Sequence, residues 1–469
     1  MVAAPEPEKS LQGAELWRVW PPVRLRVRTL RTMGVRLENP RGEIEVDPAK
    51  REFTRRDATS LILWFALITG VAIGGRIVNE TFATNILAPP LFGRFDVRVG
   101  PSTLLAVAVG CALVSWGPRL AAATEWSALL AVTTLAAVVW ALSLALVDGV
   151  DALTAPLSGS HDYLITAERI DSPGTFLRSF GDRLENFSLH VQGHPPGMVL
   201  TLWGLARIGL GGSTWAAVLV IGSGGSAAAA ALLAVRAMSG ESTARRLAPF
   251  LVLSPAAIWI ATSADAFFMG AGAWGTALLA LGAERRSDYL SLAGGIVLGL
   301  TLFLSYGAVA LAPVALVVAA HRGPRPLLVA TVGAFAVLAL FAAAGFWWFD
   351  GLPATVAQYE AGVAAQRPYA WFVLANPAAF LLALGPAVAV GLGRLRRAPT
   401  TTLACAALIG VMAANMSGLS KGEVERIWLI FVPWVLAICV TFDLRRSRGM
   451  LALQGLAALA IQTGVRTPW

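Results

Sequence analysis

Blocks of apolar residues recur along the chain from about residue 58 to its end, separated by short polar stretches. Each block is about 20 residues long, which is the length that an α-helix needs to cross a hydrocarbon core of about 30 Å. Of the 469 residues, 56% are hydrophobic and 14% are charged, whereas a typical soluble domain has about 25% charged residues. The pattern therefore predicts an all-α polytopic membrane protein.

Arginine-rich loops give the predicted helices a direction. The net charge is +9, and cytoplasmic loops of membrane proteins collect Lys and Arg, so the basic excess requires no nucleic-acid partner. With residues 1–57 as an Arg-rich cytoplasmic tail, alternating spans place nearly every Arg cluster on the cytoplasmic side. The domain 58–469 then contains about 13 transmembrane helices, at about 58–78, 101–117, 125–147, 213–235, 247–264, 266–283, 288–306, 308–320, 326–347, 369–392, 399–416, 427–442 and 450–465.

The longest polar interruption, from 148 to about 196, falls on the outer side in this topology. The short apolar stretch "GMVLTLWGLARIGLGG" at 197–212 follows it and completes a predicted outer catalytic loop, 148–212. If that stretch crossed the membrane, Arg236, Arg245 and Arg246 would lie outside, against the charge rule. We therefore predict a juxtamembrane or re-entrant helix there, and a large outer loop that holds ionisable residues close to the membrane, where such residues are functional candidates.

Five stretches of the sequence form an ordered set of motifs: "HDYLITAERI" at 161–170, "GHPPGMVLTLWGLARIGL" at 193–210, "SADAFF" at 263–268, "LGLTLFLSYGAVALAP" at 298–313 and "SKGEVERIWLIFVPW" at 420–434. Together they resemble motifs of the GT-C membrane glycosyltransferases, in particular the branch of protein mannosyltransferases and aminoarabinose transferases (glycosyltransferase family 39-like). The resemblance covers about two-thirds of the chain, and its strength lies in the order of the motifs. Two departures are Tyr163, where the family commonly has Glu, and Gly197, where it has Leu.

The resemblance implies a GT-C-like fold and an activity. The enzyme would transfer a hexose or pentose from a polyprenyl-phosphate-linked donor to a hydroxyl of a glycan, lipid or protein acceptor. It would act on the outer face of the plasma membrane, among membrane lipids, in cell-envelope and cell-wall assembly. The predominance of Arg, Ala, Gly and Val indicates a GC-rich genome, such as that of an actinobacterium.

The catalytic candidate is Asp162, which matches the acidic position of the family. A carboxylate can act as the base for the attacking hydroxyl, but Asp is also a favoured N-cap residue, and both roles are compatible. Lys421 and Arg426 are the candidates for binding the donor phosphate, because fixed positive charge stabilises a departing phosphate; the alternative is a solvated loop in which Glu423 and Glu425 pair with them. The candidate pocket residues are His161, Tyr163, Arg169, His194, Asp265, Tyr306 and Arg367.

A metal site is a further alternative. His190 and His194 are four residues apart, which would place them on one face of a helix, and His161 or Asp162 could complete the set. Gly193 and the Pro195–Pro196 pair interrupt such a helix, so no metal ligands are assigned, while a divalent metal stays open as a cofactor. The three cysteines lie within apolar segments, and their spacing predicts no disulfide framework.

Two other functions are compatible with the sequence. The first is a transporter or flippase for a lipid-linked glycan, for which we expect charges at mid-membrane and an internal repeat. The second is a non-catalytic GT-C-like protein that binds lipid. Replacing Asp162 distinguishes them from an enzyme, because only an enzyme depends on cleavage of the donor.

Overall fold

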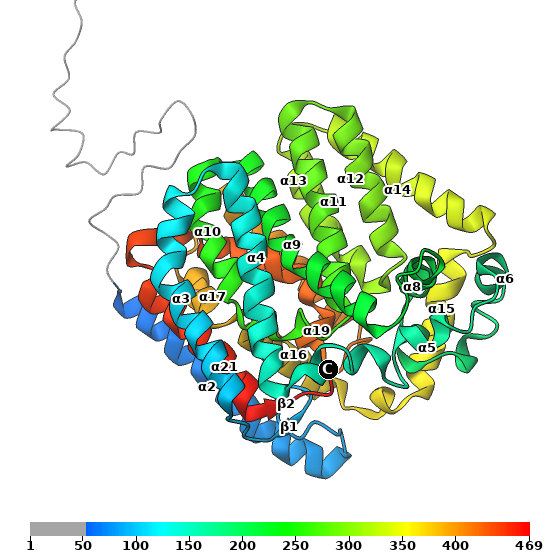
Figure 1. The fold of residues 1–469 in the computed structure, drawn as a ribbon, viewed down its shortest axis with the longest axis horizontal. Helices are drawn as coiled ribbons and strands as arrows, with labels where there is room; N and C mark the ends of the chain where they lie inside the picture. The colour runs from blue at the N-terminus through cyan, green and yellow to red at the C-terminus, as the bar shows by residue number, and fades with distance from the viewer. Residues whose placement is uncertain (1–52) are drawn as a thin grey trace, which may run out of the picture. The chain divides into compact units, whose positions relative to one another are not determined.

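The computed structural model describes residues 53–469, so most of the predicted cytoplasmic tail lies outside the described residues. The described part is almost entirely helical (Figure 1). It has eight helices that are long and apolar enough to cross a membrane, or up to nine if a bent pair counts as one span. The predicted all-α polytopic architecture is confirmed.

The long apolar helices follow the predicted spans. They are α2 (Arg55–Phe82), α3 (Pro101–Ala123), α4 (Trp126–Ala145), α9 (Ser213–Ser239), α11 (Asp265–Arg285), α14 (Arg325–Ala343), α18 (Pro399–Met416) and the composite segment Val424–Thr441. That segment consists of α19 (Val424–Ile427), η9 (Leu429–Phe431), α20 (Val432–Leu436) and η10 (Ala437–Thr441). The bent pair is α16 (Tyr369–Leu384) and α17 (Pro386–Gly393).

The other predicted spans contain shorter helices. These are α10 (Glu241–Leu253) with η6 (Pro255–Trp259), α12 (Asp288–Leu302), η7 (Tyr306–Leu311) with α13 (Ala312–Ala320), and α21 (Arg448–Gly464). Every one of the 13 predicted segments therefore contains helix, although eight or nine meet the length and composition of a full crossing.

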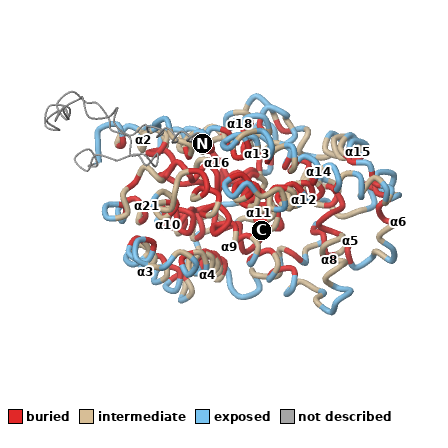
Figure 2. The backbone as a smooth tube through the Cα atoms, turned by 90° about the horizontal axis from the view of Figure 1, so that it is seen from above, coloured by how far each residue is buried: buried red, intermediate tan, exposed pale blue. Residues whose placement is uncertain are grey.

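Three elements form the centre of the bundle. In the composite segment Val424–Thr441, α11 and α9, 83%, 72% and 67% of the apolar window is buried, against 11% in α2 and 17% in α14. Figure 2 shows the same contrast between buried α9 and the more exposed α3. α9 and α11 approach closely at Gly270, where an added Cβ would overlap Ser223. Small residues allow such close approach between helices in membranes.

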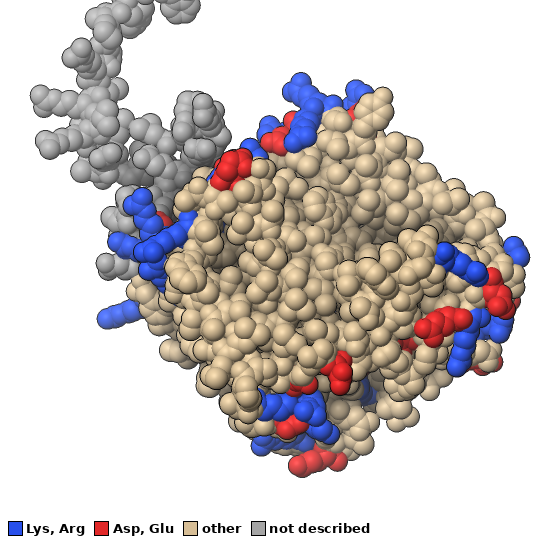
Figure 3. Space-filling model, in the orientation of Figure 1, with Lys and Arg blue, Asp and Glu red and all other residues tan. Residues whose placement is uncertain are grey.

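Ion pairs and hydrogen bonds group the helix ends into two sets. The turns predicted to be cytoplasmic contact one another, and three of these contacts are Arg245 with the carbonyls of Ala121 and Thr124, Arg325 with Asp288, and Arg394 with Asp57. The ends predicted to be external also contact one another, through Arg98 with Asp148, Arg466 with Asp96, and Arg426 with Asp265. Figure 3 shows charged side chains toward the edges of one face, with a broad uncharged area between them.

A sharp bend divides the predicted span 369–392. α16 and α17 meet at 103°, where Gly385 has a φ of +85° and Pro386 begins the second helix. Gln454 of α21 satisfies the freed backbone groups, because its side chain accepts from the Ala387 amide at 3.1 Å and donates to the Leu384 carbonyl at 2.9 Å. Broken helices persist in membranes where neighbours replace the lost hydrogen bonds in this way.

The outer loop carries short helices that are packed onto the bundle. They are η2 (Leu146–Asp148), η3 (Val150–Leu153), η4 (Pro156–Ser158), α5 (Tyr163–Ala167), α6 (Pro173–Arg178), η5 (Leu184–Asn186), α7 (Leu189–Gln192) and α8 (Gly197–Arg207). α15 (Trp348–Ala361) with η8 (Val363–Gln366) lies between the predicted spans 326–347 and 369–392, and η11 (Leu444–Arg446) precedes α21. One two-stranded antiparallel sheet pairs β1 (Arg94–Phe95) with β2 (Val465–Arg466).

α8 is anchored across the end of the bundle. Its 11 residues span about 17 Å, which is too short for a crossing. The Gly197 amide donates to the Phe303 carbonyl at 2.8 Å, and the Trp203 indole donates to the Ile170 carbonyl at 3.1 Å. Figure 1 looks nearly along α8, whereas α4 and α11 lie closer to the plane of the picture. A helix that lies on the bundle end fits the prediction for this stretch.

Candidate functional site

Asp162 is the N-cap of α5, and both of its carboxylate oxygens have partners. Oδ1 accepts from the Tyr163 amide at 2.7 Å, and Oδ2 lies 3.2 Å from Nδ1 of His190. The carboxylate is 7% exposed and the imidazole 21%. The capping role and the candidate catalytic position therefore coincide at one residue, and a histidine 28 residues downstream joins it.

The backbone around the histidines is held in place by two further hydrogen bonds. The His190 amide donates to the His161 carbonyl at 2.9 Å, and Nδ1 of His194 lies 2.9 Å from the His190 carbonyl. Because a carbonyl only accepts, Nδ1 of His194 carries the hydrogen. Burial lowers the pKa of His194 to about 4, against the nearby negative charge of Asp265, so His194 is neutral at physiological pH. α7 ends at Gln192, which confirms that no continuous helix carries both histidines.

Tyr163 joins the loop to the central helix α11. Its ring centroid lies 5.8 Å from that of His190, 5.6 Å from His194 and 6.3 Å from Phe268. His194 also contacts Phe268 at 5.6 Å. Burial raises the pKa of Tyr163 well above its usual value, with help from the negative charges of Asp265 and Asp162. Phe268 lies three residues after Asp265, so the same face of α11 carries the next part of the site.

Asp265 and Arg426 form a buried ion pair. Nη1 of Arg426 donates to Oδ2 of Asp265 at 2.7 Å, and the two side chains are 7% and 5% exposed. Ser263 donates its hydroxyl to the same carboxylate oxygen at 2.7 Å. Nη2 of Arg426 donates to Oε2 of Glu423 at 2.7 Å, and this second carboxylate is 24% exposed. Arg426 therefore lies between two carboxylates, of which the outer one is closer to water.

Aromatic rings link Arg426 to Arg367. The Arg426 guanidinium lies 4.1 Å from the ring centroid of Trp469, Trp469 stacks on Phe92 at 5.3 Å, and the Arg367 guanidinium lies 5.1 Å from the ring of Phe92. The pairing of β1 with β2 brings the segment around residue 92 to the segment that ends at residue 469. The chain of rings lies directly beside the ion pair.

Lys421 lies in a neighbouring polar cluster. Its ammonium donates to the Ala365 carbonyl at 2.9 Å and lies 5.8 Å from the Tyr359 ring. Arg367 donates to the Thr84 carbonyl at 3.1 Å and to the Lys421 carbonyl at 2.5 Å. Lys421 and Arg367 thus connect three loops, and neither is bonded to Asp162. Glu423, two residues on, has a φ of +63°, a left-handed conformation that costs a non-glycine residue roughly 1–2 kcal/mol.

The side chains of the remaining predicted pocket residues make no hydrogen bond or ion pair with Asp265 or Arg426 in the described part of the chain. His161 and Arg169 are exposed at either end of α5. Within the described residues, the Arg169 side chain makes no hydrogen bond and no ion pair. Tyr306 begins η7 and packs edge-on against Trp348 at 5.3 Å. The structure therefore brings together Asp162, Tyr163, His194, Asp265 and Arg426, and leaves Tyr306 and Arg169 in other surroundings.

Two aromatic residues of the site, Phe92 and Trp469, lie outside the quoted motifs, in segments that connect or end the helices. Phe268 belongs to the motif at 263–268, but only Asp265 of that motif is predicted as a pocket residue. Glu425 is fully buried; its Oε1 accepts from the Phe92 amide at 2.9 Å, and its Oε2 has no hydrogen-bond partner. The sequence suggests Glu425 only as a partner of Lys421 or Arg426; in the described residues Glu423 pairs with Arg426, and Glu425 forms no such ion pair.

The described residues contain no group of three or more His, Cys, Asp and Glu side chains that could hold a metal ion. Nδ1 of His194 is bonded to a carbonyl and Nδ1 of His190 to a carboxylate. The ligand set suggested by the spacing of His190 and His194 is therefore not assembled here.

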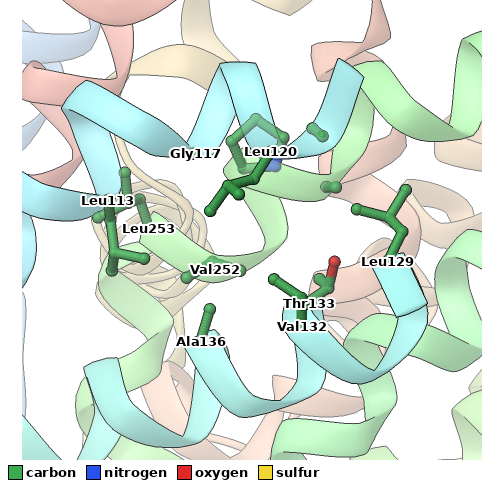
Figure 4. Close-up of a pocket in the computed structure, with 12 residues that line it drawn as sticks. Leu113, Gly117, Leu120, Leu129, Val132, Thr133, Ala136, Val252 and Leu253 are labelled. Carbon is green, nitrogen blue, oxygen red and sulfur yellow. The ribbon is translucent and has the colours of Figure 1, made fainter. Parts of the chain in front are cut away.

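The cavity shown in Figure 4 lies elsewhere. It measures about 40 Å³ and lies between α3, α4 and α10. Residues such as Leu113, Leu129 and Val252 line it, Thr133 is its polar member, and none of its lining side chains is titratable. It offers no group for acid–base chemistry.

Comparisons with known proteins assign no family to the chain. No family model matches the chain, and no curated protein matches it. Among solved structures, the chain is similar to the crystal structure of the Archaeoglobus fulgidus oligosaccharyltransferase in complex with Zn and sulfate, with 13% sequence identity and a TM-score of 0.33 over 73% of this chain. The chain covers 54% of the length of that protein. A likeness at this level assigns no activity, so any function rests on the residues of this chain.

Proposed function

We propose that this chain is a membrane glycosyltransferase of the GT-C type, which transfers a sugar from a polyprenyl-phosphate-linked donor to an acceptor hydroxyl on the outer face of the plasma membrane. The observation that carries the proposal is the convergence of Asp162, Asp265 and Arg426. These residues come from three distant motifs, which the sequence resemblance gives in that order, and they lie around Tyr163 and His194.

The two parts of the reaction need two kinds of group. The acceptor hydroxyl must lose a proton as its oxygen attacks the anomeric carbon, and the base chemistry depends on the Asp162 carboxylate. The bond between the anomeric carbon and the phosphate oxygen breaks, and the lipid phosphate leaves with the electron pair. Fixed positive charge at Arg426 and Lys421 stabilises that leaving group.

Arg426 can bind a phosphate by exchanging one partner. Asp265 and Ser263 hold the inner side of this buried network, while Glu423 is the more exposed partner. A phosphate oxygen that replaces the Glu423 carboxylate would keep Arg426 doubly paired and would bring negative charge within reach of the segment that contains Lys421. Asp265 is then the group that keeps Arg426 in place.

A complementation experiment tests the proposal. A deletion strain of the native host is complemented with the wild type, with Asp162→Asn or with Glu168→Gln. Glu168 is the matched control, because it is an exposed carboxylate six residues after Asp162. We expect Asp162→Asn to lack one envelope glycan or glycolipid and to accumulate its polyprenyl-phosphate sugar, while Glu168→Gln restores the wild-type profile.

Two results would contradict the proposed glycosyl transfer. An Asp162→Asn protein that is expressed normally and restores the full glycan profile would overturn the proposal. Accumulation of a complete lipid-linked glycan on the cytoplasmic side, with donor cleavage intact, would indicate a transporter instead.

A further inference from the structure

Each oxygen of the Asp162 carboxylate already has a hydrogen-bond partner, whereas the imidazole beside it has a free nitrogen. Oδ1 of Asp162 holds the Tyr163 amide and Oδ2 faces Nδ1 of His190. In the described residues, Nε2 of His190 makes no hydrogen bond, and it is not among the buried atoms that lack a partner. The side chain is 21% exposed, so Nε2 is the basic atom of the pair that a substrate can reach.

The hydrogen-bond partners fix the tautomer of His190. A carboxylate that is ionised only accepts, so the hydrogen between Oδ2 and Nδ1 belongs to the imidazole. Neutral His190 then has its lone pair on Nε2, which is the tautomer that a general base requires. A carboxylate on Nδ1 also stabilises the imidazolium that forms when Nε2 takes a proton, as in carboxylate–histidine pairs of hydrolases.

The backbone holds the imidazole in this position from both sides. The His190 amide donates to the carbonyl of His161, the residue before Asp162, and the His190 carbonyl accepts from His194. The Tyr163 ring packs against the imidazole at 5.8 Å between centroids. The pair is therefore built from two segments, with few degrees of freedom left to the imidazole.

Asp162 is the charged side chain that contacts His190. α7 packs against α5, η5 and α15, and His194, on the same segment, is neutral at physiological pH. In the described residues, no hydrogen bond or ion pair joins His190 to the other titratable side chains on those elements, which are Tyr163, Glu185, Asp350, Tyr359 and Glu360.

We propose that His190 is the general base of the transfer reaction and that Asp162 acts as the positioning carboxylate behind it. Nε2 takes the proton of the acceptor hydroxyl while the acceptor oxygen bonds to the anomeric carbon. The bond from that carbon to the phosphate oxygen breaks, and the polyprenyl phosphate leaves with the electron pair. This inference rests on the proposed glycosyl transfer and names the atom that receives the proton.

The test uses the purified full-length protein in liposomes, with polyprenyl-phosphate sugars and acceptor lipids extracted from host membranes. His190→Asn keeps an amide near the Nδ1 position, so it can still donate to Asp162, but it has no base. We expect kcat to fall by at least 100-fold, in the range typical of a lost general base, with KM for the donor changed less than threefold. The decline of wild-type turnover toward acid pH should disappear in the residual activity of the variant.

Chemical rescue separates a base from a structural role. His190→Ala should regain at least tenfold turnover when imidazole is added, whereas the wild type should not respond. His321→Asn is the control, because His321 lies between α13 and α14, among the turns predicted to be cytoplasmic, and we expect its turnover to be that of the wild type.

Two results distinguish the possible failures. A wild type that transfers sugar, together with a His190→Asn variant that keeps its turnover and its acid decline, would refute the role of His190 and leave the proposed function standing. A folded wild type that cleaves no lipid-linked sugar would refute both. If His190→Asn does not fold, the imidazole response of His190→Ala decides: a response supports the base, and its absence in a folded protein contradicts it.

Discussion

Arg426 and Asp265 are 161 positions apart in the sequence, yet their side chains share a hydrogen bond of 2.7 Å at one end of the helix bundle. Both are almost completely buried. A buried ion pair is costly to break from one side, because the remaining charge stays in a medium that solvates it poorly. The pair therefore links the composite segment Val424–Thr441 to α11 as well as contributing charge to the candidate site.

Asp265→Asn should destabilise the protein strongly. Removing one partner of a buried pair costs about 3–5 kcal/mol, and Glu423 remains as the only carboxylate on Arg426. Glu423→Gln is the matched control, since the more exposed pair is worth about 1 kcal/mol or less. Thermal unfolding in detergent measures the difference, and equal losses of stability in the two variants would contradict the greater contribution of the buried Asp265 pair.

Gly197→Ala should disturb the packing of α8 against Phe303. A Cβ at residue 197 would overlap the Phe303 carbonyl oxygen and lie 2.8 Å from its carbon, so α8 must shift, at a cost of roughly 1–3 kcal/mol. Gly204→Ala, on the same helix with open space around it, should gain up to about 1 kcal/mol from helix propensity. Melting temperatures of the two variants should change in opposite directions; a Gly197→Ala protein as stable as the wild type would contradict the close packing.

His194 should make stability depend on pH. Its pKa is lowered to about 4 in the folded chain, against about 6.5 when unfolded. The unfolded state therefore binds the proton more readily, so the contribution to stability is complete above about pH 6.5 and is lost as the pH falls toward 4. The loss is at most about 3 kcal/mol. Between pH 7 and pH 4.5, the melting temperature should fall more steeply in the wild type than in His194→Gln. An equal fall in the two proteins would be evidence against the contribution of His194.

The aromatic ring of Trp469 should stabilise the folded protein. It covers the Arg426 guanidinium and stacks on Phe92, contacts that are worth about 0.5–2 kcal/mol and 0.5–1.5 kcal/mol in other proteins. Trp469→Ala should lower the melting temperature by several degrees, and Trp469→Phe should recover at least half of that loss. A phenylalanine variant no better than the alanine variant would mean that the ring contacts contribute nothing.

The helices and several site residues can be predicted from the sequence, but the contacts that these site residues make with one another cannot. Apolar length and Arg position predict the spans, because those properties are local. The choice of Asp162, Asp265 and Arg426 follows from motifs, but nothing local indicates that Arg426 meets Asp265. His190 has a recognisable spacing to His194, which suggests a shared metal; its actual partner, Asp162, is set by how α5 and α7 fold together.

The aromatic part of the site was beyond prediction for the same reason. Phe92 and Trp469 come from opposite ends of the sequence and meet because β1 pairs with β2. A two-residue strand has no periodicity to detect. The bend between α16 and α17 is similar: the sequence predicts one span at 369–392, and Gln454, which satisfies the backbone groups freed by the bend, lies in α21.

Donor cleavage by the purified protein tests the proposed glycosyl transfer most directly. Full-length protein in liposomes is given host polyprenyl-phosphate sugars carrying a radiolabelled sugar, together with host acceptor lipids, and the release of polyprenyl phosphate and the labelled product are followed. We predict that the wild type and Glu168→Gln release polyprenyl phosphate and form labelled product in equal amounts, and that Asp162→Asn is slower by at least 100-fold. Equal rates for Asp162→Asn and the wild type, or a folded wild type that leaves the donor intact, would contradict it.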